Sequence, residues 1–130
     1  MTMPKPEIII SSDDLERLEG LLYSPAARGR RDLDALRDEL ERAEVRAPED
    51  MPADVIRMES RARFQDLEAD RIYEFTLVYP GNAAPDTDRV SIFSPAGSAL
   101  LGLSKGQIIE WPTADARTAR LEVLDVVQHA

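Results

Sequence analysis

The sequence predicts an α+β protein in which a short N-terminal antiparallel helical hairpin precedes a domain with a five-stranded sheet and one short helix. Before residue 46, leucines recur three and four residues apart, which is the spacing of an amphipathic helix. After residue 53, apolar and polar residues alternate with the period of two that is typical of strands. Residues 47–52 contain two prolines, which interrupt regular structure. We therefore expect a hairpin over residues 1–47 and a sheet domain over residues 53–130.

The first helix is expected to begin within residues 11–14, directly after a β-branched run at residues 8–10. The serine and aspartate oxygens of this segment can accept hydrogen bonds from the unpaired N–H groups of a helix N-terminus. Asp13 and Glu16 also have the spacing of a capping box. The helix should end at Ser24-Pro25, and its apolar stripe consists of Leu15, Leu18 and Leu22.

A second helix is expected over residues 32–45. Two short helices with matching stripes and a short connection favour an antiparallel hairpin, in which each helix covers the stripe of the other. The alternative, in which both helices lie flat on the sheet domain, remains open. The stripe of the second helix consists of Leu33, Leu36, Leu40 and Ala43.

Five segments of the second half have the composition of strands, being rich in β-branched and aromatic residues. The first two alternate most clearly and are separated by a turn at residues 67–70. We therefore expect one antiparallel or mixed sheet, with its aromatic side chains in the core. The five segments are residues 56–64, 72–79, 90–93, 107–111 and 120–127.

A short helix is predicted between the third and fourth of these strands. Ser94 can cap it, Pro95 suits the first helical position because it needs no N–H partner there, and Gly102 can end it. This segment therefore predicts about two helical turns.

The charge of the chain argues against direct binding to nucleic acid or to a membrane surface. Its 130 residues carry a formal charge of −9, which repels phosphate backbones and anionic lipids. The chain contains no cysteine, and it shows no apolar run of signal-peptide or membrane-spanning length. We expect a protein of the cytoplasm.

No motif in the chain indicates an enzyme. The single histidine, His129, lies one residue from the end, and the glycines between residues 97 and 106 match no nucleotide-binding motif. We therefore expect no catalytic residue, no metal and no cofactor. One basic cluster, formed by Arg28, Arg30 and Arg31, lies at the expected hairpin tip, where it either contacts an acidic partner or stays hydrated.

Residues 91–102 resemble the C-terminal domain of the Gre transcript-cleavage factors, in which this segment reads close to S-x-x-SP-x-G-x-ALLG. The resemblance implies a short antiparallel coiled coil followed by an FKBP-like domain, and RNA polymerase as the partner, bound at the rim of its secondary channel. In the competing interpretation, Leu100 and Leu101 are buried in the core of the sheet domain. The residues implied in docking are Ser94, Pro95, Gly97, Ala99, Leu100, Leu101 and Gly102.

Four further segments, at residues 6–10, 49–55, 76–80 and 121–124, resemble the Rnk branch of this superfamily, which implies an influence on nucleoside diphosphate kinase. The chain departs from the cleavage factors because its arms are short and its tip is basic. Of the tip residues Arg28, Arg30, Arg31 and Asp32, the last is expected to be a helix N-cap. We therefore predict competition with Gre-type factors without catalysis. A prolyl isomerase and a transcript-cleavage cofactor are the alternatives.

Overall fold

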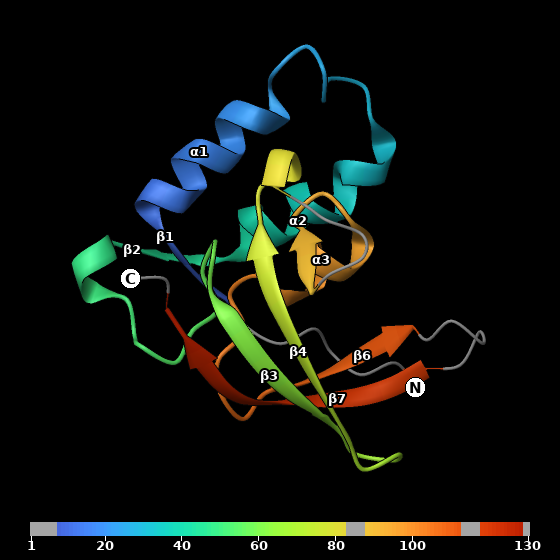
Figure 1. Ribbon diagram of the computed structural model, residues 1–130. Helices are drawn as coiled ribbons and strands as arrows, with labels where there is room; N and C mark the ends of the chain where they lie inside the picture. The colour runs from blue at the N-terminus through green and yellow to red at the C-terminus, as the bar shows by residue number, and fades with distance from the viewer. Residues whose placement is uncertain (1–7, 83–87, 113–117, 129–130) are drawn as a thin grey trace.

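The computed structural model describes residues 8–82, 88–112 and 118–128 and shows an α+β fold. A curled sheet forms one part of the molecule, and the N-terminal helices lie beyond one end of it (Figure 1). The elements in chain order are β1 (Ile9–Ser11), α1 (Ser12–Leu22), a 3-10 turn (Arg31–Leu33), α2 (Asp34–Arg42), β2 (Glu44–Arg46), β3 (Arg61–Asp66), β4 (Arg71–Val78), β5 (Arg89–Ser91), α3 (Pro95–Leu100), β6 (Ile108–Pro112) and β7 (Thr118–Val127).

The predicted five-stranded sheet is confirmed, with the strand order β5-β4-β3-β7-β6. It is mixed, because β4 and β5 are parallel whereas the other neighbours are antiparallel. The turn between β3 and β4 forms where predicted. The Asp66 carboxylate accepts hydrogen bonds from the N–H groups of Glu68 and Ala69 at 2.9 and 3.1 Å, and Asp70 takes a positive φ of 53°. These bonds hold the hairpin in register, with Phe64 opposite Tyr73.

The first predicted strand begins later than expected, at Arg61 instead of residue 56. Glu59 has a φ of 70°, and the N–H of Ser60 turns back to the carbonyl of Arg57 at 3.1 Å. Alternate burial nevertheless continues, because Ile56 and Met58 are both buried. Ile56 bonds to the segment that follows α3, which shows that a period of two in burial does not require a regular strand.

The strand before α1 and the strand after α2 pair with each other, which was not predicted from the sequence. The second helix ends at Arg42, and β2 then pairs in parallel with β1, so that Val45 lies opposite Ile10. The prediction of a helix to residue 45 was therefore wrong at its end. The cap of α1 is Ser11, whose Oγ accepts from the Asp14 N–H at 3.3 Å, so the capping box expected at Asp13 was also wrong.

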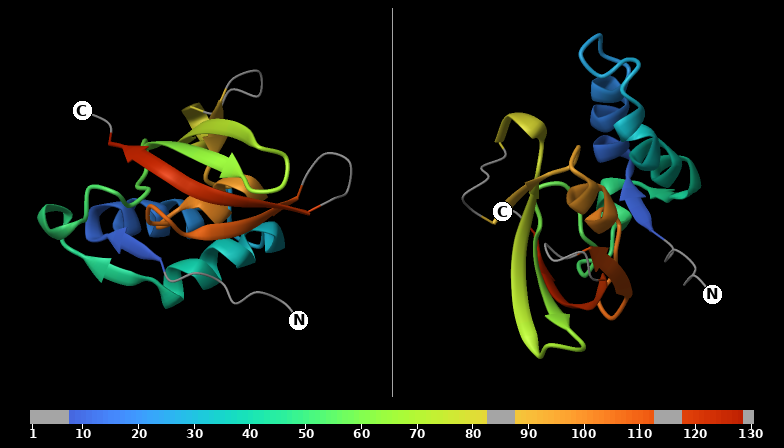
Figure 2. Two further views of the ribbon diagram at one scale, coloured as in Figure 1. Left: turned by 90° about the horizontal axis from the view of Figure 1, so that it is seen from below. Right: turned by 90° about the vertical axis from the view of Figure 1, so that its right-hand side faces the viewer.

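One hydrophobic core joins the helices to the sheet domain. The buried leucines of α1 and α2 belong to the same cluster as Phe64 of β3 and Leu100 of α3. Figure 2 shows α3 between the curled sheet and the two longer helices. A self-contained coiled coil is therefore not confirmed, and the division near residue 50 stays a prediction. None of the helices in the described ranges has the length and apolar character needed to cross a bilayer.

Candidate partner-binding site

The segment that carries the Gre-like motif forms the predicted short helix, with the predicted cap. Ser94 Oγ accepts a hydrogen bond from the Gly97 N–H at 3.0 Å and donates one to the Ser91 carbonyl at 2.6 Å. Pro95 occupies the first turn of α3, where no N–H partner is needed. These contacts fix the start of the helix against the end of β5.

Both glycines of the motif are explained by close packing. A Cβ on Gly97 would lie 1.9 Å from the Ser91 carbonyl oxygen, so only glycine lets α3 approach β5 this closely. Gly102 has a φ of 81°, and a Cβ there would lie 2.6 Å from the Cβ of Ile8. Its carbonyl also accepts from the Ile9 N–H at 3.1 Å. Gly102 therefore joins α3 to the N-terminal segment.

Leu100 and Leu101 are each only 1% exposed and lie in the core, in line with the second of the two interpretations of these leucines. Gly97 and Gly102 are buried as well. Among the predicted docking residues whose side chains are described, only Ser94 and Ala99 reach the surface, together with the preceding Phe93. Among the described side chains of the motif, any docking role therefore falls to this surface, while Gly97, Leu100, Leu101 and Gly102 pack in the interior.

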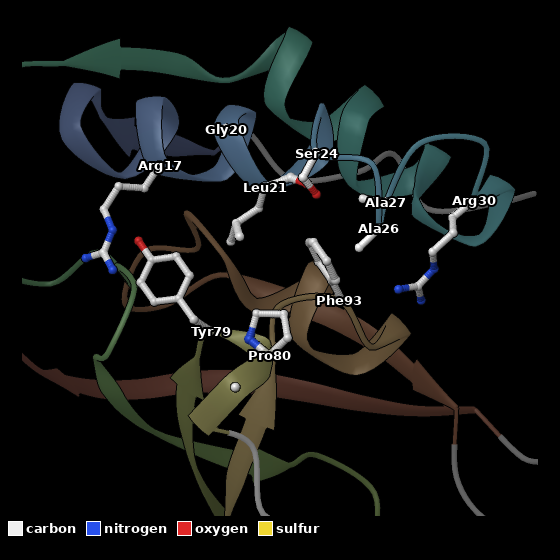
Figure 3. A pocket seen from close by; sticks show the side chains of 11 residues that line it. Arg17, Gly20, Leu21, Ser24, Ala26, Ala27, Arg30, Tyr79, Pro80 and Phe93 are labelled. Atoms are coloured by element: carbon white, nitrogen blue, oxygen red, sulfur yellow. The ribbon is translucent and has the colours of Figure 1, made fainter.

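Beside this surface lies a groove of about 550 Å³ between the helical segment and the sheet domain, which we call the arginine groove. In Figure 3, Arg17 and Arg30 lie at its opposite ends, with Phe93 and Leu21 between them. One wall comes from α1 and the tip loop (residues 23–30), and the other comes from residues 79–81, which follow β4, and from Phe93. Its lining residues are Arg17, Gly20, Leu21, Ser24, Ala26, Ala27, Arg30, Tyr79, Pro80, Gly81 and Phe93.

At one end of the groove, the Arg17 guanidinium carbon lies 4.2 Å from the centroid of the Tyr79 ring, which is a cation–π contact. Tyr79 is 8% exposed, and its buried hydroxyl has no hydrogen-bond partner among the described residues. Burial, followed by the negative charge of Asp14, raises the pKa of Tyr79 to about 12. The hydroxyl therefore stays protonated at any physiological pH.

At the other end, Arg30 lies 5.6 Å above the ring of Phe93 and forms two hydrogen bonds to the Asp32 carboxylate, at 2.6 and 3.2 Å. This bidentate pair lowers the pKa of Asp32 and raises that of Arg30. Asp32 is not the N-cap that the sequence predicted, because the chain enters α2 through the 3-10 turn and makes no side-chain cap there. The other tip residues, Arg28 and Arg31, are exposed.

The tip loop is held over the groove by Arg37 of α2. Its guanidinium donates to three carbonyl oxygens, those of Leu22 and Ala27 at 3.3 Å and that of Arg30 at 3.1 Å. A planar guanidinium is suited to this role because its five donors point in fixed directions. Arg37 therefore holds the backbone of the tip loop, including that of Arg30.

A buried carboxylate ties α1 to the sheet domain below the Tyr79 end of the groove. Asp14 Oδ2 accepts from the Met58 N–H at 3.1 Å. Burial raises the pKa of Asp14, while the Met58 bond partly offsets this effect. Asp13 lies 3.8 Å from Arg57, and hydrogen bonding to Ser11 contributes most to the lowered pKa of Asp13. These contacts fix the angle at which α1 forms the wall of the groove.

The groove was not anticipated from the sequence, because its lining comes from three separated segments. Arg17 occurs on a polar helix face without any motif, and Tyr79 and Phe93 were assigned to the core. The adjacency of Phe93 to the motif was the one available signal. Among the described residues, no group of three or more acidic or histidine side chains is arranged to hold a metal ion, and His129 lies outside the described ranges.

Comparisons with known proteins identify the family of the chain. Residues 51–128 match the family described as "Transcription elongation factor, GreA/GreB, C-term", and residues 6–45 match "Rnk N-terminus". The chain is 41% identical over 124 residues to the regulator of nucleoside diphosphate kinase of Escherichia coli (strain K12), which covers 95% of this chain and 91% of that protein. It is 34% identical over 89 residues to the elongation factor GreA of Alkaliphilus oremlandii, which covers 68% of this chain and 55% of GreA.

A solved structure, the prokaryotic transcription elongation factor GreA/GreB from Nitrosomonas europaea, superposes with a TM-score of 0.78 at 43% identity, over 95% of this chain and 99% of that one. The sheet domain and its α3 motif are thus those of a Gre-type transcription factor. The whole chain belongs to this GreA/GreB family, in the branch of the regulators of nucleoside diphosphate kinase.

Proposed function

We propose that the protein is a non-catalytic transcription regulator that binds bacterial RNA polymerase at the rim of the secondary channel and competes there with Gre-type factors. The observation that carries this proposal is the match of nearly the whole chain to a named regulator, together with a GreA/GreB C-terminal domain. In this proposal the protein acts in the cytoplasm and affects nucleoside diphosphate kinase levels through transcription.

The proposed contact surface is the exposed side of the Gre-like segment, which comprises Phe93, Ser94 and Ala99. These residues lie at the start and on the outer side of α3, where the buried Leu100 and Leu101 keep the backbone in place. A surface whose backbone is held in place suits docking, because little conformational entropy is lost when a partner binds.

The short helical segment supports a protein that occupies the channel entrance but does not stimulate transcript cleavage. Helix α1 has 11 residues and α2 has nine, so each arm is less than about 20 Å long at 1.5 Å per residue. The tip loop contains no acidic residue, and the nearby Asp32 carboxylate is already bound by Arg30. A free carboxylate that could reach a catalytic metal ion is therefore missing from the described part of the tip.

Prolyl isomerisation, the alternative implied by an FKBP-like fold, is disfavoured by the packing of the aromatic side chains. The aromatic rings of β3 and β4 pack on one another, with Phe64 lying 5.9 Å from Phe75 and Tyr73 lying 6.1 Å from Phe75. Phe64 is also fully buried. Rings that pack in this way do not line an open peptide pocket, and fold alone does not confer activity. A peptide isomerisation assay separates the two functions.

The proposal is tested by binding to purified core RNA polymerase, with and without a Gre factor as competitor. Ala99→Glu places a charge on the exposed side of α3 and is expected to weaken binding about tenfold or more, the cost of an unpaired charge in an interface. Ala35→Glu is the matched control, because Ala35 is also exposed but lies on α2.

Competition between the wild type and the Gre factor, together with selective loss in Ala99→Glu, would support docking through the α3 surface. Absence of binding by the wild-type protein at micromolar concentration would overturn the proposed function. Equal weakening by both variants would overturn the assignment to α3. Stimulation of transcript cleavage in an arrested elongation complex would contradict the non-catalytic role.

A further inference from the structure

The charged side chains that line the arginine groove are basic, whereas the molecule as a whole is acidic. The chain carries 25 acidic and 16 basic residues, yet the lining of the groove contains two arginines and no carboxylate among the described residues. Arg28 and Arg31 of the adjoining segment are also exposed and basic. In a protein of charge −9, a basic concavity is a local exception that attracts an anionic group to one place.

The two arginines of the groove differ in whether their positive charge is already paired with a carboxylate. Arg30 is already neutralised by the bidentate contact with Asp32. Arg17 makes no ion pair within the described ranges, and its guanidinium carbon lies 4.2 Å from the centroid of the Tyr79 ring. An aromatic ring occupies the face of a guanidinium but leaves its in-plane N–H donors available for a carboxylate. Arg17 is therefore a pre-positioned receptor for one carboxylate.

The middle of the groove is apolar. Leu21 from α1 and Phe93 from the sheet domain point into it, and Pro80 lies beside them (Figure 3). A volume of about 550 Å³ suffices for one large apolar side chain and its flanking backbone. The groove thus presents an apolar centre next to one unpaired cationic donor.

We propose that the arginine groove binds a polypeptide segment of RNA polymerase that carries a large apolar side chain flanked by a carboxylate. The apolar side chain lies between Leu21 and Phe93, and the carboxylate pairs with Arg17. This inference rests on the proposed function, because it names the chemistry of the partner. A nucleic-acid strand fits less well, since several unpaired cations along a track would be needed for its phosphates.

The first test uses two short synthetic peptides, each with one central leucine, flanked in one case by glutamates and in the other by lysines. Fluorescence polarisation of labelled peptide on the full-length protein is expected to show binding of the acidic peptide, with the lysine peptide at least about tenfold weaker. Equal binding of both peptides, or binding of neither, would overturn the proposal.

The second test compares two arginine variants. Arg17→Glu is expected to weaken binding of the acidic peptide and of core RNA polymerase about tenfold or more, because a cation is replaced by an anion. Arg71→Glu is the matched control, since Arg71 is also exposed and lies 5.5 Å over a tyrosine ring, that of Tyr73, but outside the groove. Arg17→Lys should bind with intermediate strength, because it keeps the charge but loses the two-donor fork.

The two readouts separate failure of this inference from failure of the proposed function. If the polymerase binds wild type and Arg17→Glu equally, the groove assignment is overturned while polymerase binding stands. If the wild type binds the acidic peptide but not the polymerase, the named partner is overturned and the proposed function fails with it.

Discussion

Replacement of Gly97 by alanine is expected to destabilise the protein strongly, because α3 packs against the backbone of β5 at this point. The new Cβ would lie 1.9 Å from the Ser91 carbonyl oxygen and 3.1 Å from the Ile92 Cα. An ordinary contact needs at least 3.4 Å, so α3 must move by about 1.5 Å. Because the opposing atoms belong to the backbone, they cannot rotate away. The cost should reach about 3 kcal/mol, the upper end for overpacked cores.

The matched control is Gly20→Ala in α1, where an added Cβ meets nothing within 4 Å. Alanine stabilises a helix relative to glycine, so this variant should gain about 0.5 to 1 kcal/mol. Urea denaturation followed by circular dichroism measures both variants against the wild type. A Gly97→Ala protein within about 0.5 kcal/mol of the wild type would refute the reasoning, because it would mean that α3 does not approach β5 as described.

Two further predictions concern the contacts that position the groove. Burial raises the pKa of Asp14 above its unfolded value of about 3.9, so its contribution to stability is complete below that pH and is lost as pH rises through the folded pKa. The asparagine of Asp14→Asn does not titrate and can still accept from the Met58 N–H. The free energy of unfolding of this variant, measured by urea titration, should therefore increase relative to that of the wild type between about pH 4 and pH 7. A difference between the two proteins that stays constant over this pH range would contradict the reasoning. Arg37→Lys should lose about 1 to 2 kcal/mol and speed amide exchange in the tip loop, because the single nitrogen of lysine cannot take the places of both Nη1 and Nη2, which bond to the three carbonyls. Unchanged exchange there would argue against the clamp.

The strands and the short helix were predictable because their signals are local. Alternation of apolar residues placed β3 and β4 with a turn between them, and the cap, proline and glycine of residues 94–102 defined α3. The predicted end of the second helix failed for a non-local reason. Residues 44–46 leave the helix to pair with β1, and a partner 35 positions away, as in Ile10 with Val45, is invisible to a local pattern.

The meaning of the motif also changed once the packing was known. From the sequence, Leu100 and Leu101 suited either the core or a partner, since a leucine has the same pattern in both roles. Their burial shows that most of the motif preserves the approach of α3 to β5 and to the N-terminal segment. The surface available to a partner is the outer side of α3 and the groove beside it.

The α+β class, the strands of the sheet, the capped short helix and membership of the Gre family could be predicted from the amino-acid sequence, because each follows from local periodicity or from a contiguous motif. The tertiary structure alone decided that the leucine stripes join the core of the sheet domain, and that Arg17, Tyr79, Arg30 and Phe93 meet at one groove. The physical reason is that a groove is a property of surfaces brought together by long-range packing. Nothing in the spacing of residues 17, 30, 79 and 93 along the chain records how α1 is tilted against β4.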